Sequence, residues 1–261
     1  MQLRDKIAVV LGASAEGGTG WAIAETLARE GAQVVIAARR LSQLQKLAQR
    51  IGGTAIQCDA AKPEDIAALA QAIADRHGSL DIAINSAAMS FIGFISDGDV
   101  ADLQRSLDIN YLAHVHFIRR MAAIMNDGGS ITLISSSSAA QPVPSRFAYA
   151  CAKAATDCLV RYAALEYGPR GIRVNSILPG PIKTEMAARV FAEPGAEAVF
   201  ETAIPLGRIG SPKDFADTCV WLAKPGYITG VNLPVSGGLH LTRVPRPDEI
   251  PGGLGMSANK S

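Results

Sequence analysis

The sequence predicts a doubly wound α/β domain, that is, a parallel β-sheet with helices packed on both of its faces. Two observations, together with a rule on crossover connections, lead to this class. Short runs rich in β-branched residues, apolar on both faces, alternate along the chain with segments of helical apolar spacing. The first such run ends in a glycine-rich turn that leads into a helix. Parallel strands also need right-handed crossovers, so this alternation places helices on both faces.

The chain opens with one strand, one turn and one helix. Residues 6–11 read KIAVVL and form the first predicted strand, and residues 19–30 keep helical apolar spacing up to Gly31, a typical helix C-cap. The same alternation then repeats to residue 235. Further strands are predicted over residues 33–38, 54–57, 80–84, 130–135, 172–177 and 227–235. Further helices are predicted over residues 41–51, 63–77, 99–126 and 146–167, and from residue 212 onwards.

Two segments break this alternation. Residues 183–211 carry prolines and glycines around short apolar helical patches, which is typical of a lid inserted after a strand. Residues 243–261 are rich in Pro, Gly and Ser, which indicates a tail that is ordered only if another part of the molecule holds it. We therefore expect one domain over residues 1–242, followed by this tail.

Composition excludes several classes of protein. The 25 basic and 24 acidic side chains give a formal charge of +1, so no general field attracts nucleic acid or an anionic membrane. The four cysteines form no CxxC pair and the four histidines show no ligand spacing, which argues against a disulfide framework and against a metal site. No stretch reaches the roughly 18 apolar residues of a membrane span, and the first residues do not read as a signal segment. We expect a cytoplasmic protein whose partner is a small-molecule substrate.

The loop from Gly12 to Gly20 lies between the first strand and the first helix. Backbone N–H groups at such a helix start can bind a pyrophosphate, and glycine lets the backbone approach it closely. Ligands of open parallel sheets bind at the carboxyl ends of the strands, where this loop would lie. A tight βα turn also uses glycine without any nucleotide, so the loop alone leaves both readings open.

The end of the second strand bears on the type of coenzyme. An NAD site places a carboxylate there for the ribose 2′-hydroxyl, whereas the 2′-phosphate of NADP needs a cation. The strand ends in Arg39 and Arg40 with no carboxylate, which favours NADP(H) over NAD(H). Two solvated surface arginines are the alternative, and Glu16 in the loop mildly opposes a 2′-phosphate.

A tyrosine and a lysine four residues apart carry the candidate chemistry. Tyr149 and Lys153 lie one turn apart on the same face of a predicted helix. An ammonium close to a phenol favours the phenolate, so we expect a lowered pKa that makes Tyr149 a usable acid and base. Ser136, thirteen residues upstream of Tyr149, can donate a hydrogen bond to a substrate oxygen.

With these residues the chain resembles the short-chain dehydrogenase/reductase family over about residues 5–240. The resemblance implies a Rossmann-like oxidoreductase of carbonyl and alcohol groups with about seven parallel strands, working as a homotetramer or homodimer. It implies the catalytic residues Ser136, Tyr149, Lys153 and Asn110, the last through a water that links Lys153 to solvent. It also implies the coenzyme-binding residues Gly12, Ser14, Gly18, Thr19, Gly20, Arg39, Arg40, Asp59, Ala60, Asn85, Ser86, Ala87, Tyr149, Lys153, Pro179, Gly180, Ile182 and Thr184.

Two departures from the family pattern keep other functions open. The glycine loop is two residues longer than the common Gly-x-x-x-Gly-x-Gly and resembles that of bacterial enoyl-carrier-protein reductases, but those enzymes space Tyr and Lys seven apart, where Thr156 stands here. Ser86 and Ala88 stand where the family usually has Asn and Gly. An enoyl or 3-oxoacyl thioester reductase is therefore one alternative. A non-catalytic dinucleotide sensor is another, although the intact Ser, Tyr and Lys set opposes it.

Apolar residues dominate the two segments expected to face the substrate. They are Met186, Val190, Phe191, Val199, Phe200 and Ile204 in the lid, and Met89, Phe91, Ile92 and Phe94 after the fourth strand. Such pockets bind by burial of apolar surface. Arg146, Lys183 and Arg189 are too scattered to predict a carboxylate clamp. We expect the enzyme to interconvert ketones and secondary alcohols of neutral, hydrophobic or cyclic substrates.

Overall fold

A computed structural model of the chain describes residues 3–251, except for the side chain of Met186. In this part of the chain seven parallel strands form one sheet in the order β3-β2-β1-β4-β5-β6-β7. The strands are β1 (Ile7–Leu11), β2 (Gln33–Ala38), β3 (Thr54–Gln57), β4 (Leu80–Asn85), β5 (Met125–Ile134), β6 (Arg173–Pro179) and β7 (Asn232–Val235). The order reverses between β1 and β4, which is where ligands of such sheets bind. The predicted Rossmann-like sheet is confirmed.

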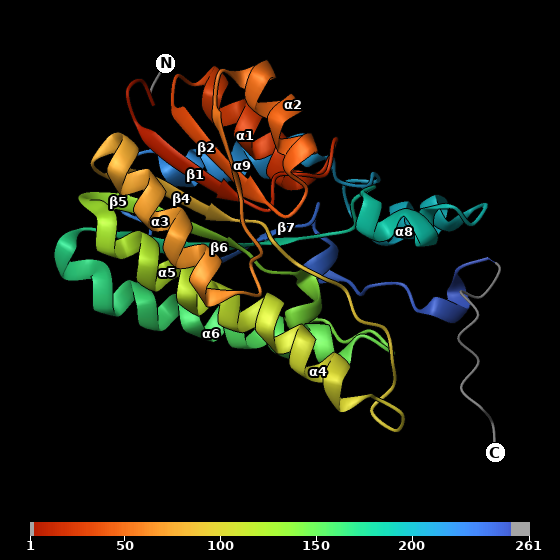
Figure 1. Cartoon of the computed structure of the whole chain (residues 1–261). Coiled ribbons are helices and arrows are strands. Elements are labelled where there is room, and N and C mark those ends of the chain that lie inside the picture. Colours follow the sequence, from red (N-terminus) through yellow and green to blue (C-terminus); the bar gives the residue numbers. More distant parts are fainter. Residues whose placement is uncertain (1–2, 252–261) are drawn as a thin grey trace.

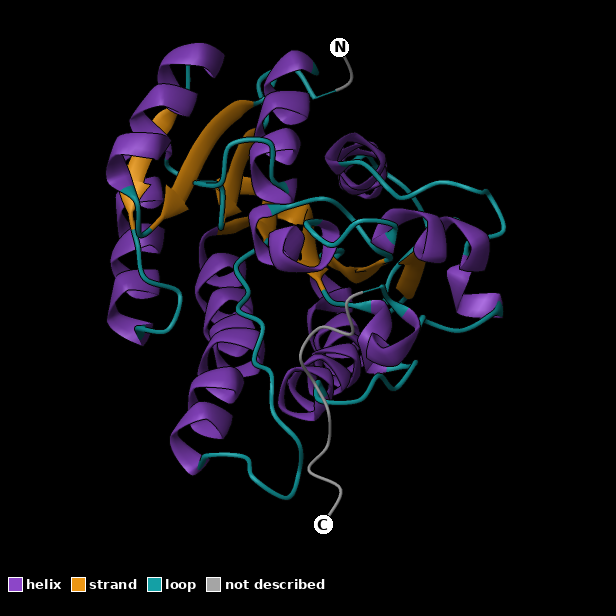
Figure 2. Ribbon diagram, turned by 90° about the vertical axis from the view of Figure 1, so that its right-hand side faces the viewer, coloured by secondary structure: helices purple, strands orange, loops and turns teal. Residues whose placement is uncertain are grey.

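Helices cover both faces of the sheet, as Figures 1 and 2 show. One face is covered by α3 (Pro63–His77), α5 (Ala113–Ile124) and α6 (Phe147–Tyr167), and the other by α1 (Thr19–Arg29), α2 (Leu41–Ile51) and α9 (Pro212–Ala223). The remaining helices are α4 (Val100–Leu107), which precedes α5, and α7 (Ala188–Phe191) and α8 (Ala196–Ala203) in the predicted lid.

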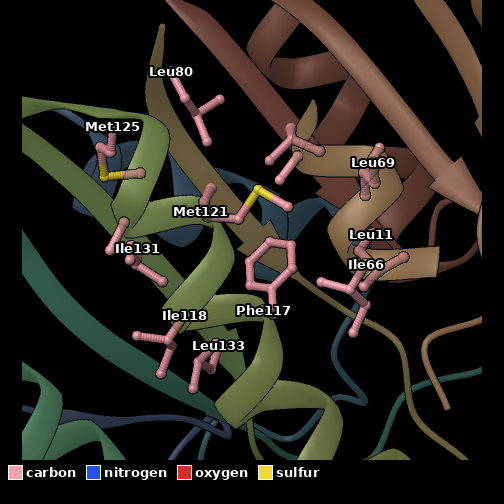
Figure 3. Packing of buried hydrophobic residues seen from close by; sticks show 14 of the residues in the cluster. Leu11, Ile66, Leu69, Leu80, Phe117, Ile118, Met121, Met125, Ile131 and Leu133 are labelled. Carbon is pink, nitrogen blue, oxygen red and sulfur yellow. The ribbon is translucent and has the colours of Figure 1, made fainter. Parts of the chain in front are cut away.

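Alternate residues of the strands supply the two cores. Val9 and Leu11 of β1 pack with α3, α5 and α6, whereas Ala8 and Val10 pack with α1 and α9. Figure 3 shows Phe117 of α5 pointing toward Leu11 and the helix that carries Ile66 and Leu69. Because β1 is buried on both faces, its sequence has no polar residue.

The predicted helix over residues 99–126 is wrong in two respects. A π-helical turn, Asp108–Leu112, interrupts it between α4 and α5, and it ends at Ile124. Met125 already pairs with Leu80 of β4, so Asn126 lies in β5 rather than in the helix. Because the apolar spacing of α5 continues into Met125, the sequence pattern does not reveal where the helix ends and β5 begins.

The segment after residue 242 is held by the lid. Ile250 is buried in a small core with Phe200 of α8 and Leu239. Arg243 forms a two-bonded ion pair with Glu249, at 2.6 Å for each bond. The lid thus holds residues 243–250 of the predicted tail, and residues 252–261 lie outside the described part of the chain.

The four cysteines all lie within the described residues. All four cysteines are free: Cys58 and Cys219 are buried, and Cys151 and Cys158 are exposed on α6. Among residues 3–251, no helix is long and apolar enough to cross a membrane. The same residues contain no cluster of three or more His, Cys, Asp or Glu side chains suited to a metal ion.

Candidate active site

A cavity of about 970 Å³ lies at the carboxyl ends of the strands. It runs from the glycine loop, past the ends of the central strands, to the lid and the segment after residue 242. The predicted site residues that line it are Gly12, Ser14, Gly18, Thr19, Gly20, Arg39, Arg40, Asp59, Ala60, Ser86, Ala87, Ser136, Tyr149, Pro179, Gly180, Ile182 and Thr184. Three predicted residues, Asn85, Asn110 and Lys153, are buried and do not line it.

Close backbone packing requires glycine at two positions of the glycine loop. Gly12 has φ +93°, and a Cβ there would lie 2.5 Å from the Ala87 nitrogen. A Cβ on Gly20 would lie 2.4 Å from the Gly12 oxygen, so both positions require glycine. The start of α1 at Gly18 has no side-chain cap and no acidic residue in its first turn, which leaves its N–H groups for an anion. These residues fit a dinucleotide.

Arg39 and Arg40 stand on the cavity wall where β2 ends, and both are exposed. Arg40 donates through Nε to Ser14 Oγ at 3.2 Å. Its two terminal nitrogens donate to the carboxylate of Glu185, at 3.2 and 3.0 Å. Asp59, after β3, accepts from the Ala61 nitrogen at 3.1 Å.

The turn after β4 is built around Asn85. Its Oδ1 accepts from the Ala87 nitrogen at 3.0 Å, and the whole side chain is buried. Within the described residues its Nδ2 has no hydrogen-bond partner. Asn85 thus shapes the turn that presents Ser86 and Ala87 to the cavity, rather than touching the cavity itself.

Ser136 and Tyr149 face the same part of the cavity, from the end of β5 and from the first turn of α6. Burial raises the pKa of Tyr149, while a hydrogen bond with Ser136 and the charge of Arg146 lower it in part. The net direction is upward, so the predicted lowering by Lys153 is not found. The opposing cation here is Arg146, three residues before Tyr149.

Lys153 is fully buried, and its Nζ lies over the ring of Tyr149. Its Nζ donates to the Ile134 carbonyl at 2.7 Å and lies 3.4 Å from Nε2 of the buried His114. The Nζ is 5.8 Å from the centre of the Tyr149 ring. Burial lowers the pKa of Lys153 to about 7, and burial together with the Lys153 charge lowers that of His114 well below its ordinary value.

Asn110 lies in the π-helical turn with all its polar groups engaged. Its Nδ2 donates to the Met89 carbonyl at 2.9 Å, and its Oδ1 accepts from the Met89 nitrogen at 3.2 Å. Its main-chain carbonyl accepts from Thr156 Oγ1 at 2.7 Å. Asn110 therefore fixes the loop after β4, and the water link expected of it stays a prediction.

Arg146 and Glu185 also line the cavity, and neither was predicted to bind the coenzyme or to take part in catalysis. Arg146 lies one turn before Tyr149 and donates to Ser90 Oγ at 2.5 Å. Its spacing of three residues from Tyr149 on one helix face was a usable signal. Glu185 comes beside Arg40 only through the fold, because 145 residues separate the two, and no local pattern indicates such a pair.

This geometry can be compared with known proteins. The family model described as Enoyl-(Acyl carrier protein) reductase matches residues 12–240. The 3beta-hydroxysteroid dehydrogenase 1 of Eggerthella lenta is 35% identical over 250 residues, which are 92% of this chain and 95% of that protein. The chain belongs to the short-chain dehydrogenase/reductase family. It is thus an oxidoreductase acting on CH-OH or C=O groups with an NAD(P) coenzyme.

Other short-chain dehydrogenases/reductases agree over nearly the whole chain. Human dehydrogenase/reductase SDR family member 4 is 32% identical and covers 91% of this chain and 90% of its own length. The solved short-chain dehydrogenase/reductase of Serratia marcescens has a TM-score of 0.85 at 33% identity, covering 92% of this chain and 100% of that chain. A relative from Mycobacterium ulcerans reaches a TM-score of 0.90 at 28% identity, over 95% and 94% of the two chains.

Proposed function

We propose that this protein is an NADP(H)-dependent oxidoreductase that interconverts a ketone and a secondary alcohol on a hydrophobic, cyclic substrate. The observation that carries the proposal is the single cavity that joins the glycine loop and the two arginines to Ser136 and Tyr149. A coenzyme held at the loop would end beside the phenol. Arg39 and Arg40, with no carboxylate at the end of β2, support NADP(H).

The coenzyme supplies or accepts a hydride when bound, and the chain's own residues handle the proton. Tyr149 Oη donates a proton to the carbonyl oxygen during reduction and takes it back during oxidation. Ser136 donates a hydrogen bond to the same oxygen and stabilises the negative charge that develops there. The positive charge of Arg146 and the hydrogen bond with Ser136 favour the phenolate form of Tyr149.

The substrate end of the cavity supports a hydrophobic substrate. Its apolar wall consists of Met89, Ile92, Val143, Val190, Phe191, Phe200, Val244, Pro245, Pro247 and Ile250. The rings of Phe191 and Phe200 lie 5.5 Å apart, so the lid presents an aromatic surface. Two relatives have names that specify hydroxysteroids, the protein of Eggerthella lenta and the 7alpha-hydroxysteroid dehydrogenase of Escherichia coli. Both names support a cyclic substrate.

The test is a series of cyclic ketones of increasing apolar size, assayed with NADPH and with NADH. We expect kcat/KM to rise with size and to be higher with NADPH. The Tyr149→Phe variant removes the transferable proton and keeps the ring, so its turnover should fall by about 10² or more while coenzyme binding persists. Near wild-type turnover in this variant would refute the proton-donor role.

Reduction of an enoyl thioester is the second candidate, because the matching family model carries that description. The bacterial enoyl reductases have a lysine seven residues after the tyrosine, whereas this chain has Thr156 there, which donates to the Asn110 carbonyl. This difference opposes the second candidate. Oxidation of NADPH by a short enoyl thioester, with no activity on any ketone, would favour this candidate. Binding of NADPH without turnover of either class would instead indicate a dinucleotide sensor.

A further inference from the structure

One ion pair joins the coenzyme end of the cavity to the lid. Arg40, after β2, meets Glu185, which lies directly before α7, in a two-bonded contact at 3.2 and 3.0 Å. The Nε of the same guanidinium donates to Ser14 Oγ of the glycine loop at 3.2 Å. Arg40 and Glu185 both line the cavity, and the side chains keep 48% and 67% of their exposure. Three segments far apart in sequence are thus tied together at one guanidinium.

The bound carboxylate has the chemistry of a phosphate. A guanidinium recognises carboxylate and phosphate groups through the same parallel pair of N–H donors. In this structure Glu185 takes both terminal nitrogens of Arg40 and Ser14 takes Nε. A 2′-phosphate that binds Arg40 through this parallel pair competes with Glu185 for the same two donors, and the carboxylate also repels it. Arg39 has no ion-pair partner among the described residues and can receive the phosphate first.

We propose that Glu185 is a specificity-determining residue for the coenzyme, one that occupies the 2′-phosphate position on Arg40 until NADP(H) displaces it. NAD(H), which has no such phosphate, leaves the pair closed. The inference rests on the proposed use of NADP(H). The Glu185 carboxylate competes with the 2′-phosphate, so it weakens the binding of NADP(H) and not that of NAD(H). Glu185 lies in the lid, outside both the glycine loop and β2.

The displacement also reaches the substrate end of the cavity. Glu185 is the first residue of the short turn Glu185–Ala187 that leads into α7, and α7 presents Val190 and Phe191 to the substrate wall. A second ion pair, Lys183 with Glu197 at 2.5 Å, joins α8 to the start of the lid and does not involve Arg40. Release of Glu185 therefore loosens residues 185–191 and leaves α8 attached. Binding of NADP(H), unlike that of NAD(H), therefore changes the mobility of the part of the substrate wall that Val190 and Phe191 form.

Calorimetric titration with 2′,5′-ADP and with 5′-AMP tests the competition without turnover. In the Glu185→Gln variant we expect 2′,5′-ADP to bind about three- to tenfold more tightly, since exposed ion pairs are individually weak, and 5′-AMP to bind as in the wild type. The matched control is Glu193→Gln, the same change in the lid away from the cavity wall. It should alter neither affinity.

The outcomes separate this inference from the proposed function. If wild-type protein binds 2′,5′-ADP no better than 5′-AMP, the NADP(H) assignment fails and the inference fails with it. If the wild type prefers 2′,5′-ADP but Glu185→Gln leaves that affinity unchanged, or changes both affinities equally, the inference alone is overturned. Hydrogen exchange tests the link to the lid: amides of residues 186–190 should exchange faster with saturating NADP⁺ than with NAD⁺. Equal rates would overturn that link.

Discussion

Arg146 is the residue whose position changes the expected electrostatics of the site. It precedes Tyr149 by three residues and is held in place by Ser90 at 2.5 Å. Burial lowers its own pKa, but a guanidinium remains charged at neutral pH, and its charge lowers the pKa of Tyr149. Arg146 therefore opposes the burial that would otherwise keep the phenol protonated.

This gives a prediction for the pH dependence of catalysis. Alcohol oxidation needs the deprotonated Tyr149, so removal of the Arg146 charge in Arg146→Gln should move the rise of kcat/KM for oxidation to higher pH. Arg146→Lys keeps the positive charge, so its pH profile should stay close to that of the wild type. The measurement is a pH profile of alcohol oxidation for the three proteins. Identical profiles for the wild type and Arg146→Gln would contradict this account.

A buried lysine makes stability depend on pH. The folded-state pKa of Lys153 is lowered to about 7, below its ordinary value of 10.5, so between these values the unfolded chain carries a proton that the folded chain lacks. Stability therefore rises with pH across this window, and the burial cost is fully present below pH 7. The neighbouring groups are His114, which stays neutral, and Asp157, whose charge favours the ammonium.

Replacement of Lys153 by Met removes this dependence. The variant should gain several degrees of Tm relative to wild type at pH 6.5, with a smaller gain at pH 9.5, since roughly 2–4 °C correspond to each kcal/mol in a chain of this size. Thermal unfolding at both pH values checks it. The control is the same change at the exposed Lys46. A gain that is the same at both pH values would show that packing, and not charge burial, dominates.

At the scale of elements, the lid and the segment that follows residue 242 act as one wall. Phe200 of α8 and Ile250 pack in the same small core, and both line the cavity. Gln141, from the loop after β5, donates to the carbonyls of Leu239 and Thr242 at 3.0 and 3.2 Å. The wall is therefore anchored to the strand end that carries Ser136.

Truncation separates the described wall from the residues beyond it. Removal of residues 243–261 takes away Val244, Pro245, Pro247 and Ile250, so discrimination between large and small apolar ketones should fall by about tenfold in kcat/KM, as apolar contact area is lost. Removal of residues 252–261 alone should leave the series unchanged. If the larger truncation does not fold, Ile250→Ala provides the milder version. An unchanged size series in every variant would exclude the segment as a wall.

The elements also show what the sequence could predict. The strands and the glycine loop follow from local patterns, because burial on both faces and tight turns restrict residue type at each position. The break in the helix over residues 99–126 could not be predicted from the sequence. At the break, the Asn110 carbonyl accepts a hydrogen bond from Thr156 of α6, a contact that no local pattern indicates. Glu185 was missed for the same reason: its partner is set by the fold. The inward turn of Lys153 depends on Ile134, nineteen residues away on β5.

At the scale of the whole molecule, large apolar side chains remain exposed on the helices. Tyr162 and Leu165 of α6 are 62% and 77% exposed, and Trp221 of α9 and Tyr227 after it are also exposed. These groups lie on both faces of the sheet, because α6 and α9 cover opposite faces. We propose that this exposed apolar surface makes contacts between copies of the chain, and two separate faces suit the homotetramer that the family resemblance implies.

Light scattering tests the assembly. We expect a mass of about four times the 27.3 kDa of one chain at micromolar concentration. Leu165→Glu places a charge on the α6 face and should reduce the mass to a smaller assembly. The control is Leu206→Glu in the lid, where an equally exposed leucine lies away from α6. A wild-type mass of 27 kDa would refute the proposal.

The two exposed cysteines among the four free ones can be labelled to follow changes in their surroundings. Burial raises the pKa of Cys58 to about 12, and Cys219 is also buried with a raised pKa, so neither supplies the thiolate that alkylating reagents attack. Cys151 and Cys158 are exposed, and both lie on α6. A maleimide dye will therefore label α6 and no other helix, without any engineered cysteine. Its fluorescence would then follow whatever covers that helix, whether another copy of the chain or a change beside Tyr149.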